Sequence, residues 1–131
     1  MKLEEMVAKI KAHPRISEAG MILCHNGIVR RTSRNGRKVH KIKVKVNHEA
    51  LTRIISEIKS RTGIIEVLAE VSEGTLKVGE DIMLVTVAGD IREHVFPALQ
   101  DLIHHIKQQI SEKEEIISGC PQPFPSKAGE T

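Results

Sequence analysis

Lysine and arginine side chains are the most prominent residues of this sequence that could take part in chemistry. Residues 30–46 hold eight basic residues and no acidic one, which leaves 12 basic and 17 acidic residues in the rest of the chain. The eight are Arg30, Arg31, Arg34, Arg37, Lys38, Lys41, Lys43 and Lys45. A segment of such charge attracts phosphates, carboxylate-rich partners or nucleic acid. A solvated strand face explains the same run, and both interpretations stay open.

Other reactive side chains show no spacing that indicates catalysis. The sequence has no phosphate-binding glycine loop and no nucleophile elbow. His104 and His105 are adjacent, so on a helix they point about 100° apart, and no histidine pair has zinc-enzyme spacing. Cys24 and Cys120 form no C-x-x-C pair, so we expect neither a disulfide framework nor a metal or other cofactor. A reducing cytoplasm is the expected compartment.

The composition narrows the class of protein. A chain of 131 residues has room for one domain, and no apolar run is long enough to cross a membrane. The only aromatic residues are Phe96 and Phe124, so Ile, Val, Leu and Met must build the core. Base stacking on aromatic rings is nearly unavailable, which argues against specific recognition of nucleic acid.

Apolar periodicity and turn residues predict the elements that position these side chains. We expect helices at residues 3–11, after an Asn47 cap, and after an Asp90–Glu93 capping box. We expect strands at residues 20–29, 41–46, 64–71 and 81–87, a bulge at Gly27, an Asn35–Gly36 turn, and a turn-rich loop at 74–80. Pro97 should kink or restart the last helix. In the strand at 41–46, the valines and isoleucine should face one way and the lysines the other.

This order predicts an α+β fold, with an antiparallel or mixed sheet and helices packed on one side. Residues 1–117 should form a single domain. Residues 118–131 contain three prolines and no apolar period, so we expect a loose C-terminal tail. A chain this short with an antiparallel sheet leaves a strand edge and an apolar helix face to cover, which favours a homodimer.

Three segments taken together resemble a known family. They are G-M-I-L-C-H-N-G-I-V-R at residues 20–30, G-T-L-K-V-G-E at 74–80, and R-E-H-V-F-P-A at 92–98. A lysine follows fifteen residues after Arg92, at Lys107. In order and interval these segments resemble the catalytic, large subunit of molybdopterin synthase. The resemblance implies that family's α/β-hammerhead-like fold.

The resemblance also implies a function and partners. Large subunits of that family dimerise, and each binds a ubiquitin-like small subunit whose C-terminal Gly-Gly carries a thiocarboxylate, giving a heterotetramer. Sulfur passes from that tail to cyclic pyranopterin monophosphate in a basic pocket, which makes molybdopterin. Carried over by position, Arg30 and Arg92 bind anions, and Lys107 is the first catalytic lysine. The second catalytic lysine would fall at Glu114, so Lys113 takes that role only with a shifted helix end.

Several positions depart from the family pattern. The histidine before the motif arginine is Ile91 here, and the phenylalanine of the first strand is His25. These departures keep a second hypothesis open, a non-catalytic relative that binds an anionic ligand or partner. A basic nucleic-acid-binding module that uses residues 30–45 is the third hypothesis, because phosphate contacts alone support non-specific binding.

The spacing of the basic residues sets a geometric condition on any shared site. In a straight helix, fifteen residues span about 22 Å, so Arg92 and Lys107 of one chain cannot hold the same small phosphate. Three solutions remain. Pro97 bends the helix, the ligand is long, or a neighbouring protomer contributes one of the two groups.

Overall fold

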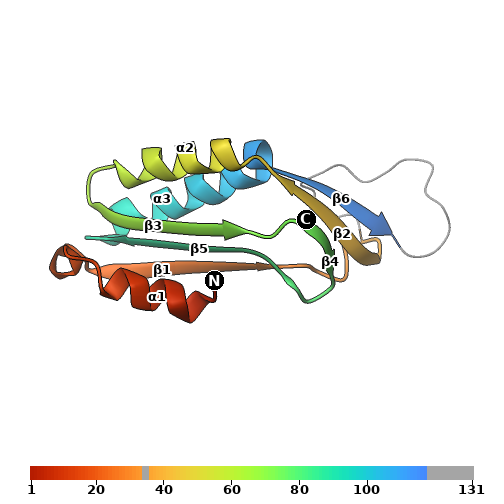
Figure 1. Cartoon of the computed structure of the whole chain (residues 1–131), viewed down its shortest axis with the longest axis horizontal. Coiled ribbons are helices and arrows are strands. Elements are labelled where there is room, and N and C mark those ends of the chain that lie inside the picture. The colour runs from red at the N-terminus through yellow and green to blue at the C-terminus, as the bar shows by residue number, and fades with distance from the viewer. Residues whose placement is uncertain (34–35, 118–131) are drawn as a thin grey trace.

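The computed structural model describes residues 1–33 and 36–117, with the side chains of 111, 112 and 114–117 left out. Asn35 of the expected turn and the expected tail at 118–131 lie outside the described residues. The elements in chain order are α1 (Leu3–Lys11), η1 (Ile16–Glu18), β1 (Met21–Ile28), β2 (Val39–Val46), α2 (His48–Lys59), β3 (Ile64–Val71), β4 (Gly74–Lys77), β5 (Asp81–Gly89), α3 (Arg92–His105), η2 (Ile106–Ile110) and β6 (Ser111–Ile117). Figure 1 shows two layers of helix around a central sheet, with a second sheet at one end. None of the described helices has the length and apolar character needed to cross a membrane.

The central sheet has the order β1-β5-β3 and is antiparallel throughout. Helices α2 and α3 lie on one face and α1 on the other (Figure 1). Val85 and Val87 of β5 belong to the core cluster under α2 and α3, whereas the hydroxyl of Thr86 donates to Met6 Sδ on α1 at 3.5 Å. The expectation of helices on one side was therefore wrong. The near-continuous apolar run of β5 is typical of a strand buried on both faces.

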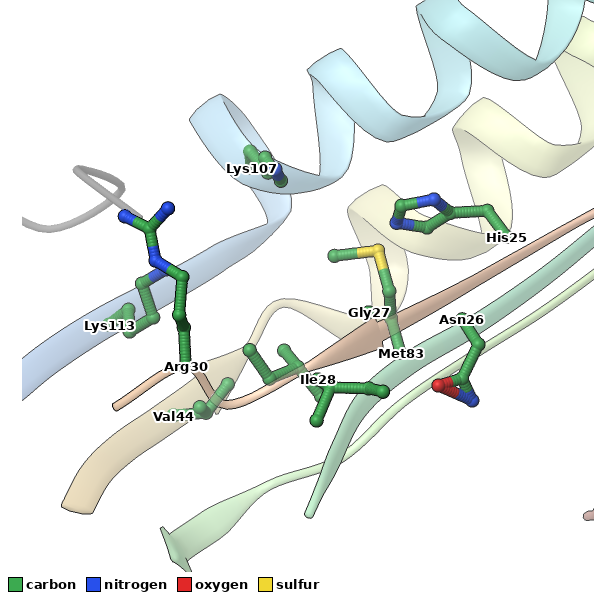
Figure 2. A pocket seen from close by; sticks show the side chains of 10 residues that line it. His25, Asn26, Gly27, Ile28, Arg30, Val44, Met83, Lys107 and Lys113 are labelled. Carbon is green, nitrogen blue, oxygen red and sulfur yellow. The ribbon is translucent and has the colours of Figure 1, made fainter. Parts of the chain in front are cut away.

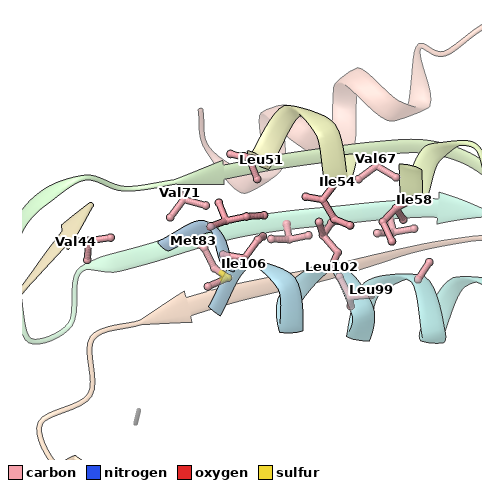
Figure 3. Close-up of a cluster of buried hydrophobic side chains, with 14 of the residues drawn as sticks. Val44, Leu51, Ile54, Ile58, Val67, Val71, Met83, Leu99, Leu102 and Ile106 are labelled. Atoms are coloured by element: carbon pink, nitrogen blue, oxygen red, sulfur yellow. The ribbon is translucent and has the colours of Figure 1, made fainter. Parts of the chain in front are cut away.

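The main core fills the space between this sheet and the pair α2 and α3 (Figure 3). Leu51, Ile54 and Ile58 form the buried stripe of α2, as their helical spacing predicts. Each fully buried aliphatic side chain contributes about 1.5–3 kcal/mol relative to an exposed one. Asn47 caps α2, with its Oδ1 accepting from the backbone N–H of Ala50 at 3.1 Å. Both features of α2 confirm the sequence-based prediction.

The second sheet has the order β4-β2-β6 and is also antiparallel. Ile42 and Val44 of β2 are buried while Lys43 and Lys45 are exposed, so the predicted alternation is confirmed. The loop expected at residues 74–80 contains the short strand β4, and β6 follows the last helix without having been expected. Strands β1 and β2 belong to different sheets and do not form a hairpin. Short edge strands carry little local signal, because pairing with β2 rather than propensity creates them.

The start of α3 differs from the expected capping box. Ile91 occupies the cap position and makes no side-chain cap, while Asp90 Oδ1 accepts from the backbone N–H of Ile91 at 2.7 Å. The same oxygen lies 2.8 Å from His94 Nδ1. Asp90 stands one residue too early to cap the helix. Asp90 instead stabilises the turn that leads into α3, because its carboxylate contacts His94 in the first turn of the helix.

Helix α3 runs through Pro97 to His105, so the helix does not restart at the proline. Its irregularity lies at the other end, where η2 continues the helix as a π-helical turn. A π-turn contains more residues per turn than an α-helix and is often found at functional sites. Strand β6 begins directly after it. The π-helical turn thus connects α3 to β6, and it carries Lys107 and precedes Lys113.

Candidate functional site

A pocket of about 270 Å³ lies where the end of β1 meets η2 and β6 (Figure 2). Three cationic side chains line it, from Arg30, Lys107 and Lys113. Gly27, Ile28, Val44, Ile82 and Met83 supply apolar walls, and His25 and Asn26 complete the lining. The three cations are far apart in sequence. The fold therefore brings together three of the four basic residues that the sequence singled out.

Arg30 enters the pocket from the segment just after β1. Its Nε donates to the carbonyl oxygen of Thr32 at 2.6 Å, which fixes the orientation of the guanidinium. Figure 2 shows the side chain extending from the end of β1 toward Lys113. A planar guanidinium held in this way can bind a phosphate or carboxylate with two parallel hydrogen bonds.

Lys107 and Lys113 reach the same pocket by different routes. Lys107 is half-buried on η2, and Lys113 is half-buried on β6. In the β2–β6 register Lys113 lies opposite Val44, and Val44 is itself a wall of the pocket. A shifted helix end was the condition for Lys113 to take part. In the structure the helical segment ends at Ile110, and the strand β6 carries Lys113.

Gly27 gives His25 its place at the edge of the pocket. The β1–β5 register shifts between Gly27 and Ile28, which confirms the predicted bulge. A Cβ added at Gly27 would lie 3.0 Å from Met83 Cγ and 3.5 Å from His25 Nε2. A larger residue there would make the Met83 side chain shift slightly and would touch His25 at an ordinary contact distance. Glycine therefore leaves room for a close approach of Met83, and its φ is not positive.

His25 lines the pocket, although the sequence patterns assigned it no role. Burial, and then the positive charge of Lys107, lower the pKa of its imidazole. The neutral imidazole is thus favoured at neutral pH beside the lysine. The only signal in the sequence was its position, where the family motif has phenylalanine.

The electrostatics of the pocket favour an anionic ligand with an apolar part. No acidic side chain is among the described residues that line it. Within the described part of the chain, neither Arg30 nor Lys107 forms an ion pair with a carboxylate. No three His, Cys, Asp or Glu side chains among the described residues come together as ligands of a metal ion. Fixed cations beside apolar walls bind anions more strongly than the same cations in open solvent.

Arg92 lies outside this pocket. It begins α3, its side chain is 79% exposed, and its Nε lies 3.8 Å from the carboxylate of Glu93. Helix α3 continues from Arg92 through Pro97 to His105, and Arg92 is not among the residues that line the pocket with Lys107, so Pro97 does not bring the two together within one chain. A long ligand or a neighbouring protomer remains as the way for Arg92 to share the site.

Comparison with known proteins identifies similar chains. A family model described as "MoaE protein" matches residues 1–109. The chain is 29% identical to the uncharacterized protein MJ0717 of Methanocaldococcus jannaschii, over 82% of this chain and 89% of that one. A molybdopterin biosynthesis MoaE protein of Burkholderia ambifaria has a similar structure, with a TM-score of 0.71, 20% identity, and coverage of 94% of this chain and 87% of that chain.

A second similar structure comes from a complex. It is a chain from the protein–protein complex of subunits 1 and 2 of the molybdopterin-converting factor of Helicobacter pylori. The TM-score is 0.68 at 15% identity, and the match covers 90% of this chain and 80% of that one. Both structural similarities confirm the α+β fold expected from the sequence.

Proposed function

The chain belongs to the MoaE family, and we propose that it is a molybdopterin synthase large subunit that transfers sulfur to cyclic pyranopterin monophosphate. The observation that carries the proposal is the convergence of Arg30, Lys107 and Lys113 on one pocket. The family motif assigns Arg30 and Lys107 to the site, and Lys113 stands one residue before the position of the second lysine. The three residues come from different parts of the chain. The donor of sulfur is a ubiquitin-like small subunit with a C-terminal thiocarboxylate.

The charges of the pocket suit both reactants. The phosphate of the pterin and the thiocarboxylate of the tail are anions, and Arg30 has the fork geometry for the phosphate. Lys107 stands beside the neutral imidazole of His25, where its ammonium can stabilise the sulfur anion and supply a proton. Each transfer replaces a carbon–oxygen bond of the pterin side chain with a carbon–sulfur bond, and the oxygen leaves as water or, where the cyclic phosphate opens, stays on the phosphate. The acyl carbon–sulfur bond then breaks, and water supplies the oxygen of the released carboxylate.

Arg92 belongs to this proposal through a homodimer. Its exposed place at the start of α3 leaves it available to a neighbouring protomer. In that arrangement the partner's Arg92 would hold one end of a ligand whose other end lies at Lys107. Mixing Arg92→Ala and Lys107→Ala proteins should then restore part of the activity, since some mixed dimers would contain one intact site. A monomer by sedimentation at micromolar concentration would contradict the homodimer.

The test of the function is conversion in vitro. The purified chain, a thiocarboxylated small subunit and cyclic pyranopterin monophosphate should together yield molybdopterin. Truncation after residue 117 should preserve the conversion if residues 1–117 are the complete domain, as we propose.

A non-catalytic relative is the second candidate, because Ile91 and His25 replace two family residues. Ile91 is 49% exposed and contributes no charge or proton donor beside Arg92. The two candidates differ in one outcome. Binding of the small subunit and of the pterin without any product would favour the non-catalytic relative.

A further inference from the structure

A second cationic cavity lies on the β4-β2 side of the second sheet, apart from the pocket described above. It has a volume of about 640 Å³. Four cations line it, Arg31, Lys38, Lys41 and Lys77, and we refer to these four as the basic groove. It shares no lining residue with the first pocket. The consecutive residues Arg30 and Arg31 thus serve different cavities.

Strand pairing holds two of these cations against each other. Lys41 of β2 lies directly opposite Lys77 of β4 in the antiparallel register. Directly opposite residues have Cβ atoms about 4.5–5.5 Å apart, and like charges in that position are destabilising. The next described lysine of β2 differs, because Lys43 lies opposite Thr75. The like-charge pair is therefore confined to the basic groove.

The described part of the chain offers no counter-charge to the basic groove. None of its four cations forms an ion pair there. Glu80 follows β4, but its Oε1 accepts from the backbone N–H of Lys77 at 2.9 Å, and Glu80 does not line the cavity. Four cations with no carboxylate among them, two of them directly opposed, leave a charge that a multivalent anion can offset.

We propose that the basic groove binds the oligophosphate group of a small molecule. Two opposed ammonium groups can share the oxygens of one phosphate, and Arg31 can bind a neighbouring phosphate with its planar fork. The cavity volume has room for several linked phosphates, since small-molecule sites commonly measure about 300–1,000 Å³. The lining contains no Phe, Tyr or Trp, and its only ring is the imidazole of His40, so four cations make the phosphates the main element of recognition.

The site is tested with sodium tripolyphosphate by calorimetry and thermal unfolding at low salt. Wild-type protein should bind one tripolyphosphate per chain at this site and gain thermal stability. Lys77→Gln should weaken binding about tenfold or more, the effect of losing a charged hydrogen bond. The same variant should also raise the melting temperature of the unliganded protein, because it removes the like-charge pair. A merely structural role for Lys77 would not give both results.

Lys43→Gln is the matched control, since it removes the same charge from the neighbouring strand β2 at a position outside the basic groove. It should leave the affinity for tripolyphosphate unchanged and should not raise the melting temperature, because Lys43 lies opposite Thr75 and not opposite another lysine. Lys107→Ala protein should bind tripolyphosphate at this site as wild type does, which separates the groove from the proposed sulfur-transfer site. Equal weakening by Lys43→Gln, or binding of long single-stranded oligonucleotides with no saturable binding of tripolyphosphate, would overturn the proposal.

Discussion

The pocket and the basic groove both gather positive charge, but they are built from different kinds of sequence. In the pocket, Arg30, Lys107 and Lys113 come from three elements and stand beside apolar walls. In the basic groove, three of the four cations come from residues 31–41, and only Lys77 is brought in by strand pairing. A run of basic residues along the chain therefore predicts the basic groove. The three cations of the pocket can be grouped only from the tertiary structure or with the help of a family motif.

The pocket and the exposed lysines of β2 should also differ in how their charges act. Lys107 is half-buried near His25, where water screens charge less and a single substitution has a large effect. Lys43 and Lys45, on the same strand as the basic groove, are exposed, so their effect depends on salt and falls off within about 10 Å. In the proposed function the pocket therefore selects the ligand, whereas the exposed lysines of β2 attract anionic partners from a distance.

The largest effect is expected at Lys107. Lys107→Ala should abolish sulfur transfer, a loss of at least about 10²-fold, because it removes the proton donor and the charge beside the sulfur. Folding and dimerisation should stay intact, since Lys107 is only half-buried and its removal leaves no buried charge without a partner. Single-turnover formation of molybdopterin and thermal unfolding measure the two effects.

The control for that experiment is Lys9→Ala, an exposed lysine on α1 that is far from the pocket in the fold. It should leave turnover unchanged. If Lys107→Ala retained full turnover, the pocket would lose its proposed role while the fold assignment would stand.

Arg30 and Arg92 test whether one chain or two chains supply the residues that bind the pterin phosphate. Arg30→Ala should weaken binding of the pterin phosphate by about 1.5–3 kcal/mol, the value of a hydrogen bond to a charged group. Arg92→Ala should have the same effect only if a neighbouring protomer's Arg92 reaches the ligand. Calorimetric titration of each variant decides this, and an Arg92→Ala protein with wild-type affinity would leave Arg92 as a surface residue.

Reversing three lysines of β2, the exposed Lys43 and Lys45 and the half-buried Lys41, should have a smaller effect that depends on salt. Changing Lys41, Lys43 and Lys45 to Glu should slow association with the small subunit about tenfold at low salt, because exposed charges act mainly by steering. The difference should shrink as salt is raised. Stopped-flow association rates at two ionic strengths are the measurement. Unchanged rates at low salt would mean that these lysines form only a solvated face.

The smallest effect concerns pH. The folded protein lowers the pKa of His25 below the ordinary value of 6.5, so protonation of His25 favours the unfolded chain. Stability is therefore fully present above about pH 6.5 and is lost as the pH falls toward the folded pKa. His25→Phe should remove this part of the acid sensitivity. Unfolding of both proteins between neutral and mildly acidic pH measures the difference, and parallel curves would contradict the assignment.

Much of the fold was determined by local sequence. The alternation of β2, the apolar stripe of α2 and the Asn47 cap were each predicted and then found, because they depend on neighbours within one element. The bulge at Gly27 was predicted for the same reason. The family motif, a pattern of intervals along the chain, pointed to Arg30 and Lys107, which line one pocket, and its strict spacing placed the second lysine at Glu114 rather than at Lys113.

Tertiary structure alone decided the rest. Strands β4 and β6 exist because they pair with β2 across long stretches of chain, and no short-range propensity encodes such pairing. The π-turn η2 and the strand after it place Lys113 in the pocket, whereas helical spacing alone had placed it out of register. Lys41 and Lys77 oppose each other only through register. Residue types and intervals fix which charges a chain carries, and contacts between distant elements fix which of those charges meet.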